Sequence, residues 1–180
     1  MRPLRYSINV SLDGCVGHEW ADPGEDLHVH SAHTVADPDA LIFGRTTYEL
    51  MEFWRDPGDI PEGFRFFADS INAQKKYLVS STRTTDDWNT ENLRGDPVEA
   101  VRALKQQPGG HLLVGGVQLP LVLADAGLID EFEFVVHPKV VGHGPTLFSG
   151  LTSMLSLELI DETRFSGGAV ARRYVPVGSS

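Results

Sequence analysis

The chain has 180 residues, of which 41% are hydrophobic and 22% charged, the composition of an ordinary globular protein with one full core. Its 25 acidic and 15 basic residues give a formal charge of −10, which disfavours nucleic acid and anionic membranes as partners. The single cysteine, Cys15, excludes an internal disulfide and any zinc site built from several cysteines, and it fits a reducing cytoplasm.

The N-terminal segment predicts a β-strand and not a signal peptide. Apolar and polar residues alternate from Tyr6 to Leu12, and the turn residues Asp13 and Gly14 follow. A signal peptide would instead carry a continuous apolar stretch. The most apolar window, Leu112 to Ile129, is interrupted by polar residues and a proline. We therefore expect no segment that crosses a membrane.

Helices and strands alternate after this first strand. A glycine-bearing loop runs to about Gly24. The patterns that follow predict a short helix over Glu25–Thr34, a strand over Ala40–Phe43 and a second helix, which ends at Asp56-Pro57-Gly58. An irregular helix over Phe64–Ile71 and a strand over Lys76–Val79 come next. The apolar stripe of the second helix is expected to consist of Thr47, Leu50, Met51 and Trp54.

The middle of the chain continues the alternation. Trp88–Leu93 predicts a short edge strand. Asp96 is a predicted N-cap for a helix that runs to Gln107, with Pro97 at its first position and Glu99 placed for a capping box. The strands predicted last cover Glu131–Val136, Leu155–Ile160 and Val170–Val175. This order predicts an α/β fold with a mixed sheet, parallel through the middle and antiparallel at the C-terminal end.

The stretch from Gly109 to Asp130 predicts a strand, a glycine turn and a helix. Leu112–Val114 is a short apolar run that ends at Gly115-Gly116, and Gly127 closes the helix that follows. A helix that begins after two residues without side chains presents unpaired N–H groups to an anion such as a nucleotide phosphate. The buried face of this helix is expected to hold Leu119, Val122, Leu123 and Ala126.

Three predicted strand ends carry groups that suit a nucleotide. They are Gly44-Arg45-Thr46-Thr47, Ser80-Ser81-Thr82-Arg83 and Gly115-Gly116-Val117-Gln118. Ligands of open α/β sheets bind outside the carboxyl ends of the strands, where such turns converge. Taken singly, each is equally well explained as an N-cap, a solvated turn or a tight corner; together they favour a dinucleotide with an additional phosphate.

Several segments in this order resemble one known family. They are SLDG (Ser11–Gly14), LIFGRTTYELM (Leu41–Met51), KYLVSST (Lys76–Thr82), LLVGGVQLPLVLADAGLIDEF (Leu112–Phe132) and HPKVVGHGPTLF (His137–Phe148). The chain resembles the dihydrofolate-reductase-like superfamily, and within it the reductase domain at the C-terminus of the bifunctional riboflavin-biosynthesis deaminase/reductase and its stand-alone relatives. The resemblance covers most of the chain.

This resemblance implies a three-layer fold with a mixed, mainly parallel eight-stranded sheet, in one domain over residues 1–176 with a flexible tail at 177–180. It implies NADPH as cofactor, a small-molecule acceptor of hydride and commonly a homodimer. By position, the cofactor's phosphates would be held by Gly44, Arg45, Thr46 and Thr47. Its 2′-phosphate would be held by Ser80, Ser81 and Thr82. Its pyrophosphate and nicotinamide side would be held by Gly115, Gly116, Val117, Gln118 and Leu119. Many stand-alone relatives carry Arg in place of Ser81, so the 2′-phosphate contact is expected to pass to Arg45 or Arg83.

Two acids are candidate catalytic residues. Asp13 lies on the loop after the first strand, where the family binds its acceptor, although it also suits a plain turn. Glu131 matches an acid of the riboflavin-pathway domain, although it also suits a solvent-facing strand position. True dihydrofolate reductases carry a buried acid in the first helix, where this chain has His28 and His30. Folate reduction is therefore disfavoured.

Two other functions compete with the reductase. His28, His30 and His33 have the residue types of a metal site, but on a helix only His30 and His33 would share a face. A nucleotide-binding, dimeric scaffold without catalysis would carry the same cofactor turns as an enzyme.

Overall fold

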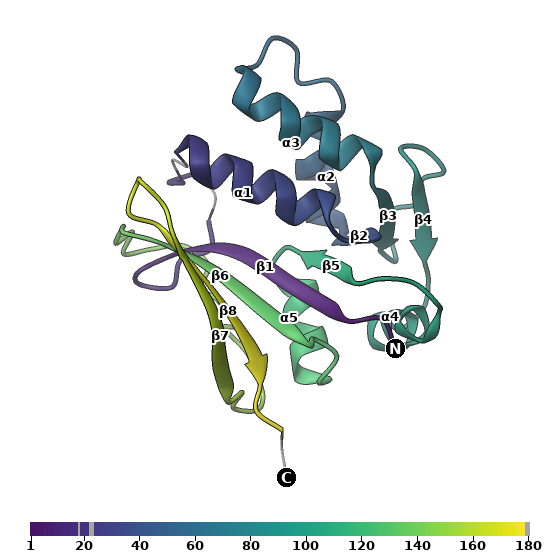
Figure 1. Ribbon diagram of the computed structural model, residues 1–180. Helices are drawn as coiled ribbons and strands as arrows, with labels where there is room; N and C mark the ends of the chain where they lie inside the picture. Colours follow the sequence, from purple (N-terminus) through teal and green to yellow (C-terminus); the bar gives the residue numbers. More distant parts are fainter. Residues whose placement is uncertain (18, 22–23, 179–180) are drawn as a thin grey trace.

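The computed structural model describes residues 1–17, 19–21 and 24–178. Within these residues one sheet runs through the molecule, in the order β4-β3-β2-β5-β1-β6-β8-β7 (Figure 1). Its strands are β1 (Leu4–Ser11), β2 (Ala40–Gly44), β3 (Lys75–Val79), β4 (Thr90–Leu93), β5 (Leu112–Gly115), β6 (Glu131–His137), β7 (Leu157–Arg164) and β8 (Val170–Pro176).

The sheet is mixed, as the sequence predicts. Neighbouring strands from β4 across to β6 are parallel, whereas β8 is antiparallel to both β6 and β7. The short strand β4 lies at one edge, which confirms the edge position expected for it. Because β2, β3 and β5 are adjacent and parallel, their carboxyl ends lie at the same edge of the sheet.

Helices cover both faces of the sheet. The face shown uppermost in Figure 1 carries α1 (Glu25–Ala36), α2 (Arg45–Met51) with its 3-10 extension η1 (Glu52–Arg55), and α3 (Glu62–Ala73). The other face carries α4 (Pro97–Gln106) and α5 (Gln118–Asp125). The irregular helix expected over Phe64–Ile71 is instead a regular helix of three turns that packs along α1.

The largest core lies between the sheet and the helices α4 and α5. It joins strand residues such as Tyr6 and Phe132 to Leu104 of α4 and Leu123 of α5, all of which are buried. A second core lies under α2 and α3, and a third joins Leu27 of α1 to β6 and β8. The sheet is thereby fixed from both faces, and the turns at its edge are built on rigid elements.

Two apolar helix faces differ from expectation. In α2, Leu50 is 47% exposed, and the buried residue is Tyr48, whose hydroxyl lies 2.9 Å from Thr90 Oγ1. In α5, Val122 is 43% exposed, and the buried residues are Pro120, Leu123 and Ala124. The sequence of α5 is apolar all round from Leu119 to Ala124, so its pattern alone could not indicate which side faces the sheet.

The helix ends follow the sequence closely. Asp96 caps α4 by accepting a hydrogen bond from Glu99 N–H at 3.0 Å, although the Glu99 carboxylate contacts Arg102 and does not complete a capping box. Gly127 ends α5 with φ of +63°, and Leu128 N–H donates to Leu123 O at 2.9 Å, the bond pattern of a glycine C-cap.

Part of the expected loop and tail lies outside the described residues. These are residues 18, 22 and 23 of the loop after β1 and residues 179 and 180 of the tail. In the described part of the tail, Val177 N–H donates to Ser156 O at 2.8 Å. None of the helices formed by the described residues is both long and apolar enough to span a membrane.

Candidate functional site

The three turns singled out from the sequence meet at one edge of the sheet. They follow the carboxyl ends of β2, β3 and β5, which are neighbours. Arg45 Nη1 donates to Thr82 Oγ1 at 3.2 Å, which joins the first turn to the second. A Cβ atom placed on Gly44 would lie 3.7 Å from Leu119 Cβ, which brings the first turn against the third. The convergence expected from the sequence is therefore present.

The glycine turn after β5 has no room for a side chain. Gly116 has φ of +99°, and a Cβ atom there would lie 2.2 Å from Thr47 Oγ1. Tyr6, in the middle of β1, donates from its hydroxyl to Gly116 O at 2.9 Å. Burial raises the pKa of Tyr6 well above its usual range, so the hydroxyl keeps its proton. The turn is thus held in a conformation that only glycine adopts easily.

The same turn exposes backbone donors at the start of α5. No described residue accepts a hydrogen bond from the N–H of Gly116 or Val117. Beside them lies a cavity of about 310 Å³. Its walls are Val117, Gln118 and Leu121 on one side and Gly144, Pro145, Thr146, Phe148 and Ser149 on the other. Free N–H groups at a helix N-terminus are suited to an anion.

The turn after β3 is organised by a serine. Ser80 Oγ accepts hydrogen bonds from the N–H groups of Thr82 at 3.2 Å and Arg83 at 2.9 Å. This arrangement leaves Ser81 and Thr82 exposed at the rim of the site. Ser80 therefore shapes the turn, and the exposed Thr82 receives the hydrogen bond from Arg45.

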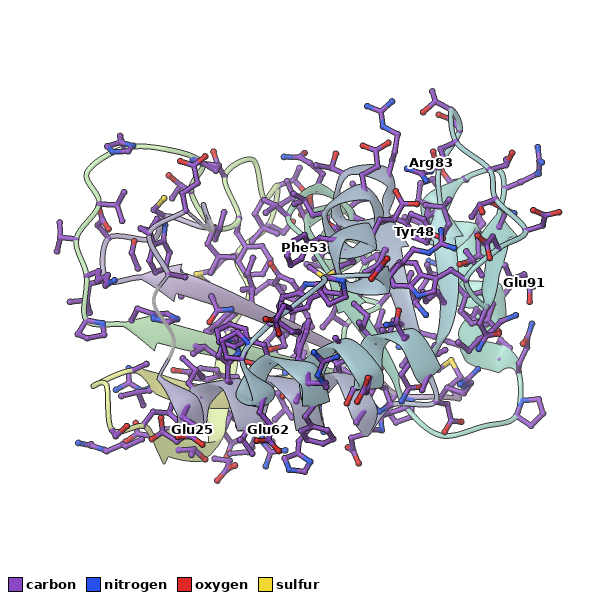
Figure 2. All side chains as sticks on the ribbon, turned by 90° about the horizontal axis from the view of Figure 1, so that it is seen from above. Glu25, Tyr48, Phe53, Glu62, Arg83 and Glu91 are labelled. Atoms are coloured by element: carbon purple, nitrogen blue, oxygen red, sulfur yellow. The ribbon has the colours of Figure 1, made fainter. Side chains whose placement is uncertain are left out.

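The two arginines beside this turn differ in their surroundings. Arg83 lies 2.6 Å from Glu52 and 3.4 Å from Glu49, and the hydrogen bond to Glu52 raises its pKa. Its guanidinium carbon also lies 5.0 Å from the centre of the Tyr48 ring, and Figure 2 labels both residues. Arg45 is exposed, and among the described residues the carboxylate that it approaches is that of Glu49, at 4.0 Å. Of the two arginines, Arg45 is therefore the one whose guanidinium can bind an anionic ligand.

The polypeptide leaves the sheet in opposite directions at β1 and β5. Helix α1 follows β1 on one face, and α5 follows β5 on the other (Figure 1). Such a point between two adjacent strands is where open α/β sheets bind their ligands. Strand β1 pairs with β5 only over Leu4–Tyr6, but with β6 as far as Ser11. Beyond Tyr6, no described strand pairs with this edge of β1, although the Ser11 N–H at its end donates to Cys15 O at 3.0 Å. We call this region, over Ser7–Ser11, the open side of β1.

An asparagine stands on the open side of β1. Asn9 is exposed although it belongs to a central strand, and the next two residues, Val10 and Ser11, are buried. Its Oδ1 lies 2.8 Å from Nε2 of His137, at the end of β6. Phe53, which is 60% exposed, appears in Figure 2 between α2 and the ribbon of β1. Sequence reasoning missed Asn9, although the polar residues at alternate positions of a central strand were a usable signal.

Asp13, expected to be catalytic, holds two loops together. Its carboxylate accepts hydrogen bonds from Ser11 Oγ at 2.5 Å, Gly142 N–H at 2.6 Å and Val141 N–H at 3.1 Å. These bonds, with the Ser11 hydroxyl first, lower the pKa of Asp13 to about 2. The carboxyl group is therefore ionised at neutral pH and holds the turn in place, and its catalytic role stays a prediction.

Glu131, the other expected catalytic residue, is paired with arginines. Its carboxylate lies 2.6 Å from Arg5 Nε and 3.6 Å from Arg173. Both arginines line a polar cavity of about 500 Å³ between α1 and strands β1, β6, β7 and β8. This cavity shares no lining residue with the one beside α5. The structure therefore does not bring Glu131 together with the cofactor turns.

The three histidines of the metal alternative have separate partners. The rings of His28 and His33 lie edge-on against Phe64 and Phe66, and His30 Nε2 lies 3.3 Å from the Glu133 carboxylate. No group of three or more metal-ligating side chains occurs among the residues that the structure describes. The contacts of these histidines thus give no support to a metal site.

Comparison with known proteins agrees with this architecture. YwjB, an uncharacterized protein of Bacillus subtilis (strain 168), is 30% identical over 181 residues, covering 93% of this chain and 94% of its own. The crystal structure of a putative riboflavin biosynthesis protein from Shewanella sp. PV-4 matches with a TM-score of 0.72 and 20% identity, over 98% of this chain and 99% of that one.

A bifunctional enzyme shares the fold in one part of its chain. It is the diaminohydroxyphosphoribosylaminopyrimidine deaminase/5-amino-6-(5-phosphoribosylamino)uracil reductase of Thermotoga maritima, with a TM-score of 0.67 and 18% identity over 98% of this chain and 57% of that one. The sequence profile of the RibD C-terminal domain matches residues 2–171. The chain therefore belongs to the RibD C-terminal domain family.

Proposed function

We propose that the protein is an NADPH-dependent oxidoreductase that transfers hydride to a small-molecule acceptor. The observation that carries the proposal is the open glycine turn at Gly115-Gly116, which meets the Gly44–Thr47 turn at the carboxyl edge of the sheet. Membership of the RibD C-terminal domain family supports the same class of reaction, because the Thermotoga maritima relative is named as a reductase.

The residues at the edge fit the chemistry of a phosphorylated dinucleotide. Backbone N–H groups at Gly116 and Val117 are free to bind a pyrophosphate. The turn that begins at Gly44 would bind phosphate through Arg45, Thr46 and Thr47. Ser81 and Thr82, together with Arg45, would hold the 2′-phosphate, with Ser80 shaping their turn. Of the two arginines considered for that phosphate, we assign Arg45, because Arg83 is already paired with two glutamates.

When bound, NADPH supplies the hydride itself. The chain's own residues would hold the cofactor through the three turns, with Gln118 and Leu119 completing the side next to α5. The acceptor would occupy the open side of β1, next to the glycine turn. Neither Asp13 nor Glu131 serves as proton donor in this proposal, because the first is ionised and the second is paired with Arg5.

Cofactor titration of a glycine variant tests the proposal. We expect the wild-type protein to bind NADPH more tightly than NADH in calorimetry. We expect Gly116→Asp to abolish binding, because its Cβ would collide with Thr47 and its carboxylate would repel phosphate. Gly95→Asp is the matched control, since Gly95 also has positive φ, +87°, but no atom within 4 Å of the added Cβ. Unchanged NADPH affinity in Gly116→Asp, with a normal far-UV spectrum, would contradict the proposed site.

One observation favours a second candidate, a nucleotide-binding scaffold without catalysis. Neither of the acids expected from the sequence is placed to donate a proton to an acceptor. The two functions are separated by following NADPH absorbance with carbonyl, imine, pterin and quinone acceptors. Binding of NADPH without consumption across this panel would favour the scaffold, whereas consumption with any acceptor class would establish the reductase.

A further inference from the structure

Asn9 occupies an unusual position for a polar side chain. Central strands of parallel sheets are normally covered on both faces, yet Asn9 is exposed in the middle of the sheet. It shares the α1 face of β1 with Ser7, which donates to the Glu133 carboxylate at 2.9 Å, and that carboxylate contacts His30 of α1. Helix α1 therefore covers the strand at Ser7 but leaves Asn9 open, next to the end of β5.

The orientation of the Asn9 amide is fixed by a buried histidine. His137 is 3% exposed, and its burial, followed by the charge of Lys139, lowers its pKa, so the ring is neutral. Its Nε2–H donates to Asn9 Oδ1 at 2.8 Å. Trp20 packs edge-on against the His137 ring, with centroids 5.3 Å apart, and restrains it.

This arrangement turns the carboxamide into a hydrogen-bond donor. The Asn9 oxygen is engaged by His137, while no described residue accepts a hydrogen bond from its Nδ2. A carboxamide has two N–H donors on that nitrogen. The open side of β1 therefore presents a donor, held in one orientation, to whatever molecule occupies it.

We propose that Asn9 selects the acceptor by donating a hydrogen bond from Nδ2 to a carbonyl oxygen. The proposal rests on the reductase function proposed above and adds the residue that determines which acceptors bind. His137 is a positioning residue, which acts through Asn9. Compounds that offer an amino group at the same place are rejected, because two donors would then face each other.

The test replaces the hydrogen-bond donor at Asn9 with an acceptor and compares two ligands, one with acceptors and one with donors at the same ring positions. Uracil offers carbonyl oxygens at the two ring positions where 2,4-diaminopyrimidine offers amino groups. We expect the NADPH-loaded wild-type protein to prefer uracil in NMR titrations. Asn9→Asp, nearly identical in shape but only an acceptor when ionised, should shift the ratio of the two affinities toward the diamine by about tenfold or more.

Each outcome has a definite meaning. An unchanged affinity ratio in Asn9→Asp, or no uracil binding to the loaded wild-type protein, overturns the assignment of Asn9. A loss of NADPH affinity in Asn9→Asp as large as the loss for uracil would make Asn9 a cofactor contact and also overturn it. Failure of the wild-type protein to bind NADPH would instead refute the reductase proposal, so the two failures are distinguishable.

Substitution of His137 tests whether this residue orients the Asn9 amide. His137→Leu removes the donor to Asn9 Oδ1 and frees the amide to rotate, so the preference for uracil should fall while NADPH affinity is retained. His137→Gln keeps an N–H donor and should restore part of the preference. An equal preference in all three proteins would show that His137 does not orient Asn9.

Discussion

The two residues of the glycine pair differ in how strictly they require glycine. A Cβ atom on Gly115 would lie 3.2 Å from the Phe43 ring, a contact that a small shift relieves, whereas one on Gly116 would lie 2.2 Å from the Thr47 hydroxyl. The sequence shows both glycines, but not that Thr47, 69 positions away, fills the space beside the second one. Identifying the essential glycine therefore required the structure.

Arg45 is predicted to determine the choice between NADPH and NADH. Arg45→Gln removes a charge that is free to bind phosphate, so NADPH affinity should fall by about tenfold or more, while NADH affinity stays nearly unchanged. Calorimetric titration of the variant with both cofactors measures this. Arg83→Gln is the control, because Arg83 is paired with Glu52 and Glu49 and its loss should leave the ratio of the affinities as it is. If the ratio of NADPH affinity to NADH affinity falls in Arg83→Gln and not in Arg45→Gln, the 2′-phosphate contact belongs to Arg83.

The acids show where residue-level reasoning from sequence ends. Asp13 binds the N–H groups of Val141 and Gly142, which follow it by 128 and 129 positions. Glu131 pairs with Arg5 because β1 and β6 place these residues side by side. A motif indicates that an acid is present, but its pKa and its freedom to react depend on such distant neighbours.

At the level of elements, the loops after β1 and β6 form one unit. Cys15 and Thr146 make an isolated antiparallel bridge, Leu147 N–H donates to Gly14 O at 2.9 Å, and Leu12 N–H donates to Lys139 O at 2.8 Å. Asp13 adds its bonds to the same pair of loops. Because Gly144–Ser149 forms a wall of the cavity beside α5, this unit determines the shape of the proposed cofactor site.

The contribution of this unit to stability should depend on pH. The pKa of Asp13 is lowered from 3.8 to about 2 in the folded protein, so the unfolded chain binds a proton more readily. The stabilisation is therefore complete above about pH 4 and is lost as the pH falls toward about 2. Urea unfolding between pH 5 and 2.5 should show a weaker pH dependence for Asp13→Asn than for the wild-type protein.

The control for this experiment is Asp59→Asn. Asp59 is exposed, and no described residue donates a hydrogen bond to its carboxylate. Its substitution should leave the pH dependence unchanged. Identical pH profiles for wild type and Asp13→Asn would show that the bonds to the second loop do not stabilise the fold.

Elements with a strong local signal were predicted well. Asp96 and Pro97 fixed the start of α4, and Gly127 fixed the end of α5, because caps depend on residues adjacent in the chain. The buried faces of α2 and α5 could not be predicted in the same way. They depend on how each helix is set against the sheet, and only the packing of Tyr48 and Ala124 reveals that.

At the scale of the whole molecule, the fold class and the convergence of the three turns were predictable. Alternation of strands and helices indicates parallel strands, and parallel strands bring their carboxyl ends to one edge. The open side of β1 was not predictable, because it depends on β5 ending while β1 continues. The position of the edge proposed for the cofactor was therefore anticipated, and that of the region proposed for the acceptor was not.

The homodimer implied by the family resemblance stays a prediction, and β7 is the surface we expect it to use. This outer strand is exposed along most of its length, and Leu159 and Ile160 are each 49% exposed. A second copy pairing along this edge would cover both. Light scattering should give twice the chain mass of 19.8 kDa, and Ile160→Lys should give the monomer. Phe66→Lys, at an exposed site on α3, should stay dimeric; a monomeric wild-type protein would refute the expectation.

The opposite placement of α1 and α5 divides the protein's tasks between separate stretches of chain. Asn9 and helix α1 lie in the first of these stretches, beside the place proposed for the acceptor, whereas residues 44–119 supply the three turns proposed for the cofactor. Under the proposed function, substitutions in the first stretch would change which compound is reduced and leave the binding of NADPH unchanged. Proteins that share this arrangement could acquire new substrates through substitutions in one loop, in one helix and at Asn9.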